Sequence, residues 1–290
     1  MTYKLIMTPY LTSRSGQCGF DAGVVIAKRF KAHLDVVHMR RRLSVPASGY
    51  YPIAETYIEE NFDALMASEK QLASDLKHLF KDQCVKQSID ILEAANHTDD
   101  KGATASWSDL TANYLYDLAA RARITDLICM ARPGADMPGN EIDLITEIIF
   151  QSGRPTLIVG DDAMTKFPET IAVAWNGGRE AARALDAALP ILKQAQQVFV
   201  TTIGKPAWAC EPSEKAVAYL RLHGINALCS HPQLKKHEKA EAVFLEHAKE
   251  REAELIVMGA YSHSRWREVV LGGFTRHMLR NSDIPLLMAH

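Results

Sequence analysis

Residues 255–275 read LIVMGAYSHSRWREVVLGGFT and combine three features of an anion-binding site. The apolar run 255–258 predicts a buried strand, Gly259 opens a loop, and a helical pattern begins at Gly272. Glycine lets backbone N–H groups approach an anion, and a helix start supplies unpaired donors with a partial positive charge. A strand, a glycine loop and a new helix therefore predict an α/β unit that can hold a phosphate group.

The chain contains two copies of this unit. Residues 125–130 (TDLICM) align with residues 253–258 (AELIVM), and residues 146–159 align with residues 275–288. Each half also opens on an apolar run, LIMTP in the first and TIAVA in the second. The repeat predicts two domains of one fold, at residues 1–162 and 168–290.

Short β-rich runs alternate with longer helical patterns in both halves. The predicted strands are 4–9, 33–38, 87–92, 125–130 and 155–159, then 170–175, 197–203, 225–229, 253–258 and 284–288. The predicted helices include 18–31, 56–80, 107–123, 178–194, 212–223, 236–251 and 272–281. Alternating strands and helices predict parallel sheets with helices on both faces.

This double pattern resembles the tandem universal stress proteins. Their nucleotide motif is a glycine, two residues, a second glycine, nine residues, a third glycine and then Ser or Thr. Gly259, Ser262, Gly272 and Gly273 fall on these positions, so the first and third match. The resemblance covers nearly the whole chain. It implies two flavodoxin-like or Rossmann-like units with five-stranded parallel sheets, packed as an internal pseudo-dimer.

The resemblance implies ATP or AMP in the second half only, with Mg²⁺ as the candidate companion of ATP. Asn176 stands where ATP-binding relatives carry Asp and would face the adenine or ribose, and Ile203 would be the apolar neighbour of the base. The other implied binding residues belong to the loop and the following helix start: Met258, Gly259, Tyr261, Ser262, Gly272, Gly273, Phe274 and Thr275.

Four residues depart from the family pattern: Trp175, Asn176, Ser262 and Gly273. The serine adds a Cβ where a positive φ is expected, Gly273 lacks the phosphate-binding hydroxyl, Asn176 lacks the carboxylate, and Trp175 is bulky enough to occupy the base pocket. An alternative without a ligand stays open, in which Gly259 and Gly272 only let the loop turn and the last helix pack closely.

The first half has lost the pattern. Its equivalent stretch is 130–134 (MARPG), and Asp143 stands where the second glycine pair belongs, so a carboxylate would repel a phosphate. No Asp or Asn follows its first strand either. We expect this half to serve packing, dimerisation or another ligand.

Composition excludes several classes of protein. The chain has 290 residues, is 47% apolar and carries a formal net charge of -2, which gives no basic footprint for nucleic acid. No apolar run is long enough to span a membrane, and the N-terminus lacks the layout of a signal peptide. The five scattered cysteines without a CxxC pair predict reduced thiols in a cytoplasmic protein and argue against a zinc site.

Catalytic signatures are absent from the sequence: it contains no GxxxxGK[ST], no GxSxG and no HExxH. His231, His237 and His247 are predicted to be surface residues, and we predict neither catalytic residues nor metal ligands. Three functions follow: a non-catalytic nucleotide-binding stress protein, a nucleotide-independent scaffold, and a slow ATPase. We expect a dimer of tandem chains and unidentified protein partners. The Pro/Gly/Tyr-rich segment 43–56 is either a lid or partner surface or a solvated connection.

Overall fold

The computed structural model describes residues 2–11, 13–41, 52–112, 116–132, 141–160, 164–204, 212–260 and 273–290. The strands of the first half are β1 (Leu5–Pro9), β2 (His33–Arg41), β3 (Asp90–Ile91), β4 (Thr104–Ala112), β5 (Leu127–Ala131) and β6 (Thr156–Val159). Those of the second half are β7 (Thr170–Ala174), β8 (Gln197–Thr201), β9 (Ala227–Ser230), β10 (Leu255–Gly259) and β11 (Leu286–Ala289).

The helices follow the alternation that the sequence predicts. They are α1 (Ser13–Phe30), α2 (Pro52–Gln87), α3 (Tyr116–Ala122), α4 (Glu141–Ser152), α5 (Arg179–Leu192), α6 (Ser213–Leu222), α7 (Ala240–Glu250) and α8 (Gly273–Asn281), with short 3₁₀ turns at Ala94–Asn96 and Asp99–Lys101. The predicted helices did not include α4. Of the segment 43–56, residues 43–51 lie outside the described residues and residues 52–56 begin α2.

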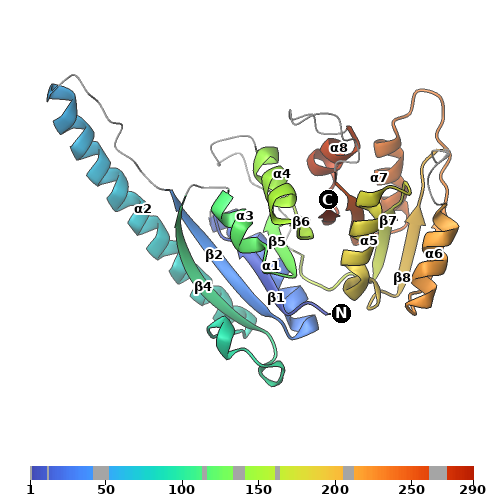
Figure 1. The fold of residues 1–290 in the computed structure, drawn as a ribbon, viewed down its shortest axis with the longest axis horizontal. Coiled ribbons are helices and arrows are strands. Elements are labelled where there is room, and N and C mark those ends of the chain that lie inside the picture. The colour runs from blue at the N-terminus through green and yellow to red at the C-terminus, as the bar shows by residue number, and fades with distance from the viewer. Residues whose placement is uncertain are drawn as a thin grey trace.

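All strands join one sheet in the order β3-β4-β2-β1-β5-β6-β11-β10-β7-β8-β9. In the inner strands β1, β2, β5, β6, β7, β10 and β11, alternate residues enter one of two cores, since successive side chains point to opposite faces. One core packs beneath α1, α2, α5 and α6, and the other beneath α3, α4, α7 and α8. Both cores contain residues of both halves. Figure 1 shows the two halves side by side, with α2 extending beyond the sheet. The predicted α/β class is confirmed.

The two halves meet at the antiparallel pairing of β6 with β11, whereas every other described strand pair is parallel. Leu157 lies opposite Leu287, and both are fully buried. Beside the pairing, the Tyr3 hydroxyl donates to the Ala187 carbonyl at 2.6 Å. Because the last strand of each half pairs antiparallel with the other, the halves are related as the two subunits of a symmetric dimer would be.

One part of the first half differs from the prediction. The helix predicted at 107–123 is wrong over its first six residues, which belong to β4, and α3 begins only at Tyr116. Ala105 and Trp107 of β4 face the α1/α2 core, while Thr104, Ser106 and Ser108 point to the opposite face. This alternation is that of a strand. Because β4 takes the place beside β2, the strand predicted at 87–92 shrinks to the two-residue edge strand β3, and the first half has six strands rather than five.

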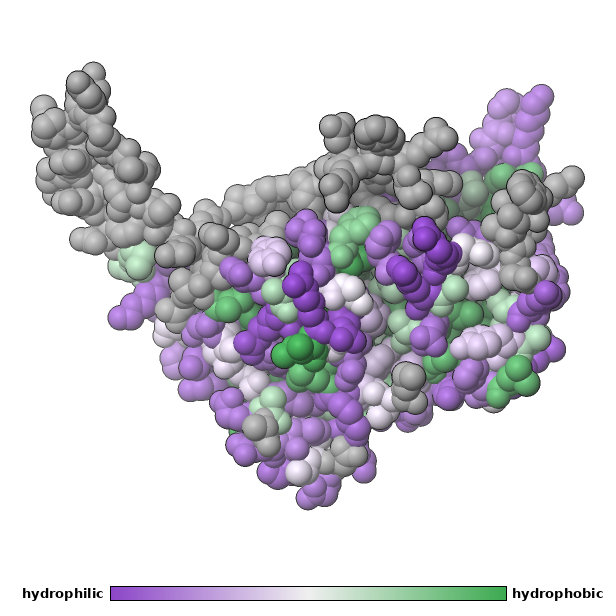
Figure 2. Space-filling model, viewed as in Figure 1, coloured by the Kyte–Doolittle hydropathy of each residue, from purple (hydrophilic) through white to green (hydrophobic). Residues whose placement is uncertain are grey.

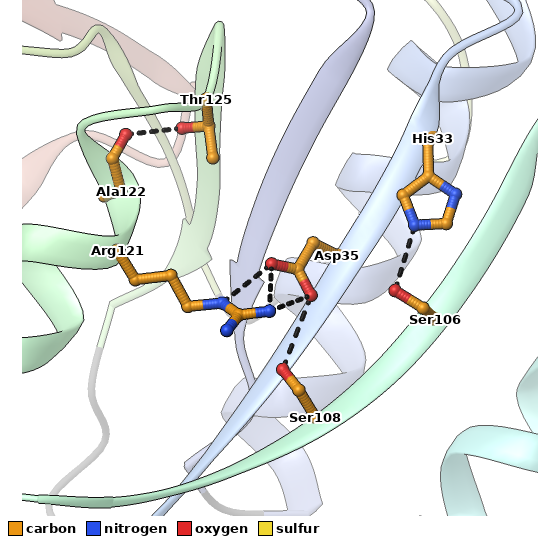
Figure 3. A network of polar contacts seen from close by, with 7 residues as sticks. All are labelled: His33, Asp35, Ser106, Ser108, Arg121, Ala122 and Thr125. Carbon is orange, nitrogen blue, oxygen red and sulfur yellow. Dashed lines mark hydrogen bonds and ion pairs between the residues drawn. The ribbon is translucent and has the colours of Figure 1, made fainter. Parts of the chain in front are cut away.

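A polar network holds β2, β4 and α3 together (Figure 3). Arg121 of α3 donates to both carboxylate oxygens of Asp35, at 2.9 and 3.1 Å, and the Ser108 hydroxyl lies 3.4 Å from the same carboxylate. His33, which is 2% exposed, places its Nε2 2.9 Å from Ser106 Oγ and its Nδ1 2.8 Å from Thr104 Oγ1. Burial first, and then the neighbouring His97, lower the pKa of His33 to about 4, although Asp35 opposes this shift.

On the face drawn in Figure 2, hydrophilic residues cover most of the described surface and apolar residues form small separate groups. Among the described residues, no helix is long and apolar enough to cross a membrane. Within the described ranges, Cys18, Cys84, Cys129 and Cys229 are not in disulfide bonds.

We expect Leu157→Ala to lower the free energy of unfolding by about 2–5 kcal/mol, because it leaves a cavity at the β6–β11 pairing. Urea unfolding followed by circular dichroism should still show one transition, since both cores cross that pairing. Leu222→Ala is the control, because Leu222 is 88% exposed, and it should change stability by no more than about 0.5 kcal/mol. Two separate transitions, with only one of them shifted, would contradict a shared core.

We expect His33 to make the protein less stable in acid. Its pKa is near 4 when folded and 6.5 in its ordinary state, so between these values only the unfolded chain takes up the proton. The contribution is complete above about pH 6.5 and is lost as the pH falls toward 4, in total about 3 kcal/mol. Unfolding free energies measured from pH 7 to pH 4 should have a flatter slope for His33→Gln than for the parent protein. An unchanged slope in His33→Gln would refute this assignment.

Candidate nucleotide site

The candidate site lies where the strand order of the second half reverses. Strand β7 sits between β10 and β8, and the chain leaves β7 to one side before it returns to the other. Ligands of open α/β sheets bind at the carboxyl ends of the strands at such a switch point. The three strand ends here carry Asn176 after β7, Ile203 after β8 and Gly259 at the end of β10. The structure therefore brings these three predicted residues to one edge of the sheet.

Asn176 is exposed and forms the turn that starts α5. Its Oδ1 accepts a hydrogen bond from the Gly178 backbone N–H at 2.9 Å, and Gly178 is the N-cap residue of α5. The side chain is therefore held by its own turn. Since the bond uses Oδ1, the amide NH₂ is the group that Asn176 presents to a ligand. Relatives with Asp would present a second acceptor there instead.

Ile203 and Trp175 pack into different cores. Ile203 is partly buried against the core beneath α7 and α8, whereas Trp175 packs against the core beneath α5 and α6. The backbone of Trp175 is fixed to β8, because its N–H donates to the Thr201 carbonyl and its carbonyl accepts from the Thr202 hydroxyl, each at 2.9 Å. The two side chains therefore lie on opposite faces of the sheet, and Trp175 does not cover Ile203.

Gly259 has a packing role of its own. A Cβ at this position would lie 2.5 Å from the backbone carbon of Glu180 and 2.6 Å from the backbone nitrogen of Ala181. The first turn of α5 thus approaches the end of β10 so closely that only glycine fits. This agrees with the alternative in which Gly259 serves packing, but the helix it accommodates is α5 and not the last helix.

The start of α8 supplies the other described candidates. Gly273 is exposed, Phe274 packs edge to face on Phe244 with ring centroids 5.6 Å apart, and Thr275 is buried. Met258 is buried in the core beneath α7 and α8. Thus Phe274, Thr275 and Met258 contribute to packing, and Gly273 is the accessible residue of this group. The candidates Tyr261, Ser262 and Gly272 lie outside the described residues.

Two carboxylates near the site were missed by the sequence reasoning. Glu180, in the first turn of α5, is 7% exposed and lies 3.7 Å from Arg179. Glu241 Oε1 would lie 3.8 Å from a Cβ at Gly273. Acidic residues stabilise helix starts, and Glu180 follows that first-turn pattern, which could have been noticed in the sequence. Both carboxylates weaken the attraction of this edge for a phosphate.

At the strand ends of the first half, the backbone has the same arrangement as in the second half but carries different side chains. The Tyr10 N–H donates to the Val37 carbonyl at 2.9 Å, and the His38 Nδ1–H donates to the Tyr10 carbonyl at 2.8 Å. These bonds correspond to those of Trp175 with Thr201 and Thr202 in the second half. Tyr10 is fully buried, its hydroxyl donates to Gln83 Oε1 at 2.6 Å, and His38 is buried as well. Large side chains of the protein itself therefore occupy the strand ends of the first half. The Asp143 side chain lies outside the described residues.

Comparison with known proteins identifies the second half. A profile described as the universal stress protein family matches residues 168–290. These residues form a universal stress protein domain. A search of curated proteins found no match to the sequence.

Solved structures extend the likeness in fold to the whole chain. A universal stress protein from Archaeoglobus fulgidus DSM 4304 superposes with a TM-score of 0.67 at 12% identity, covering 98% of this chain and 97% of that one. A functionally unknown protein from Pseudomonas aeruginosa PAO1 gives 0.56 at 14% identity, covering 99% and 92%. The fold of the whole chain is thus similar to that of a universal stress protein, and the family profile matches the second half.

We expect Gly259→Ala to destabilise the protein by about 1–3 kcal/mol, because the added methyl group forces α5 away from β10. Thermal and urea unfolding measure the change. Gly160→Ala is the matched control, because a Cβ at Gly160 meets no atom within 4 Å. If both variants unfold alike, the close approach of α5 does not explain this glycine.

Proposed function

We propose that this protein is a non-catalytic, cytoplasmic stress-response protein that binds ATP or AMP in its second half. The observation that carries the proposal is the difference between the two switch points. The second half presents an exposed amide at Asn176, a partly exposed apolar side chain at Ile203 and the exposed Gly273, whereas the first half carries the apolar Leu11 and the buried Met39 at the positions equivalent to Asn176 and Ile203. Among the described residues, the switch point of the second half is the one that exposes groups suited to a nucleotide.

Each residue suits one part of a nucleotide. Ile203 offers an apolar contact to the adenine ring, and the Asn176 NH₂ offers a donor to a ring nitrogen or a ribose oxygen. The start of α8 offers backbone N–H groups and the positive end of a helix dipole to the phosphates. In the motif positions outside the described residues, Tyr261, Ser262 and Gly272 would complete this phosphate loop.

The nearby carboxylates make Mg²⁺ relevant to affinity. Glu180 and Glu241 place negative charge close to the proposed phosphate position, and a divalent ion bound to ATP would offset the repulsion. AMP carries less charge than ATP and should depend less on Mg²⁺. A glycine loop and a helix start bind phosphate without activating water, which requires a positioned base. Binding that favours one of two conformations would let the nucleotide regulate a dimer of tandem chains or a protein partner.

Calorimetric titration with ATP, AMP and inorganic phosphate, each with and without Mg²⁺, tests the proposal. We expect one nucleotide per chain. Gly273→Asp should lower ATP affinity by about tenfold or more, since lost charge-assisted bonds cost about 1.5–3 kcal/mol each. Gly273→Asn is the control, because it adds the same bulk without the charge. Both replacements should be tolerated by the fold, as Asp and Asn are common at helix starts.

Three outcomes would overturn parts of this proposal. No heat and no thermal shift at millimolar ATP would favour the nucleotide-independent scaffold. Equal losses of ATP affinity in Gly273→Asp and Gly273→Asn would show that the phosphates do not bind at the start of α8. Magnesium-dependent phosphate release that Gly273→Asp abolishes would show the slow ATPase instead of a binding protein.

A further inference from the structure

Three side chains with metal-binding atoms converge at the far edge of the second half. Glu214 lies in the first turn of α6, Cys229 lies in β9, and His231 directly follows β9. One donor atom of each residue lies within 4.8 Å of the others. Among the described residues this is the one group of three such side chains that meets this distance.

The three residues are held by the frame of the sheet. Cys229 pairs with Val200 of β8, and the Ser230 carbonyl accepts from the Thr202 N–H at 3.1 Å just before His231. On the other side, the buried Ser213 starts α6 and places its hydroxyl 3.3 Å from His231 Nε2. His231 Nε2 also lies 3.2 Å from Glu214 Oε1. The imidazole and the carboxylate already meet, and the strand fixes the thiol beside them.

We propose that Glu214, Cys229 and His231 form a binding site for Zn²⁺. A thiolate, an imidazole and a carboxylate are a donor set that zinc accepts, whereas Mg²⁺ and Ca²⁺ prefer oxygen ligands. Metal–ligand distances of about 2.0–2.3 Å require tetrahedral donors to lie roughly 3.3–3.8 Å apart. The His231–Glu214 distance of 3.2 Å is close to this range, and the 4.8 Å limit leaves only small side-chain movements. Three protein ligands leave the fourth position for water or a further ligand.

The sequence hid this site because its ligands come from separate elements. Cys229 and His231 are two residues apart, and Glu214 lies on a different helix, so no zinc motif spacing appears. The three histidines that the sequence suggested as a group are also separated. His237 precedes α7 rather than lying within it, and His247 bonds to Ser230 at 2.6 Å and faces Glu250 at 3.5 Å. Of these three histidines, His231 is the one that lies beside the Cys229 thiol.

The competing explanation is an ordinary ion pair between His231 and Glu214. The two explanations differ at Cys229, because only a metal site requires the thiolate as a ligand. The test is titration of the metal-free, reduced full chain with Co²⁺ followed by Zn²⁺. We expect one equivalent of Co²⁺ to give tetrahedral visible bands and a thiolate-to-cobalt charge-transfer band, both removed by Zn²⁺. Cys229→Ser should abolish the charge-transfer band, and His231→Gln and Glu214→Gln should each weaken Zn²⁺ binding by at least about tenfold.

Matched controls keep the result interpretable. His223→Gln changes another histidine of the same region, which packs on Tyr219, and should leave the titration unchanged. The series is repeated in a Cys210→Ser background, because Cys210 is close in the sequence to Glu214 and lies outside the described residues. Since the Glu214 and His231 side chains are largely exposed, their variants should fold as the parent does, with equal thermal unfolding of the metal-free forms. Zn²⁺ should raise the unfolding temperature of the parent and of His223→Gln equally, and that of the three ligand variants less or not at all.

Three results would overturn the site. The first is a Co²⁺ spectrum without the charge-transfer band, which would leave only the ion pair. The second is Zn²⁺ binding that survives Cys229→Ser with unchanged affinity. Equal stabilisation by Mg²⁺ or Ca²⁺ would also contradict it, because a thiolate site should discriminate against both.

Discussion

The antiparallel pairing of β6 with β11 is the contact on which the rest of the molecule depends. It turns two α/β units into one sheet and lets both cores pass from one half to the other. It also sets the direction of each half. Because all strands within a half are parallel and the halves run in opposite directions, their carboxyl edges lie on opposite sides of the common sheet. A ligand at one switch point therefore cannot contact the other, and any coupling between them must pass through the packed cores.

The two halves fill one backbone arrangement at the strand ends with different side chains. In both, the residue after the first strand is fixed by its N–H and its carbonyl to the neighbouring strand, through His38 in one half and Thr202 in the other. In the first half this residue is Tyr10, whose ring lies so close to α1 that a Cβ at Gly16 would come within 2.5 Å of it. In the second half Trp175 packs on one face and leaves Ile203 partly exposed on the other.

Much of this fold follows from local pattern. Apolar runs of strand length, helical periodicity and the internal repeat predict the α/β class, the two units and most elements within a few residues. The misread segment is β4, where the apolar residues are few and half of the side chains satisfy a polar network rather than a core. The serines and threonines of β4 can be buried because they form hydrogen bonds with His33 and Asp35, which lie about 70 positions earlier in the chain. A local stretch of sequence does not include both partners, so the local pattern does not predict these bonds.

The candidate site was predicted less completely for the same reason. The sequence identifies Gly259 as part of a motif, yet the structure gives this glycine a task that any bound nucleotide would leave unchanged, the close approach of α5. A motif glycine is therefore weak support for a ligand when a neighbouring helix already requires it. Residues without a packing role are more informative, and here these are the amide of Asn176, the accessible side of Ile203 and Gly273. The same reasoning applies at β9, where Cys229, His231 and Glu214 meet beside the sheet and do not contribute to either core as fully buried residues. Since burial does not explain the convergence of these three side chains, a bound metal ion gives it a physical reason.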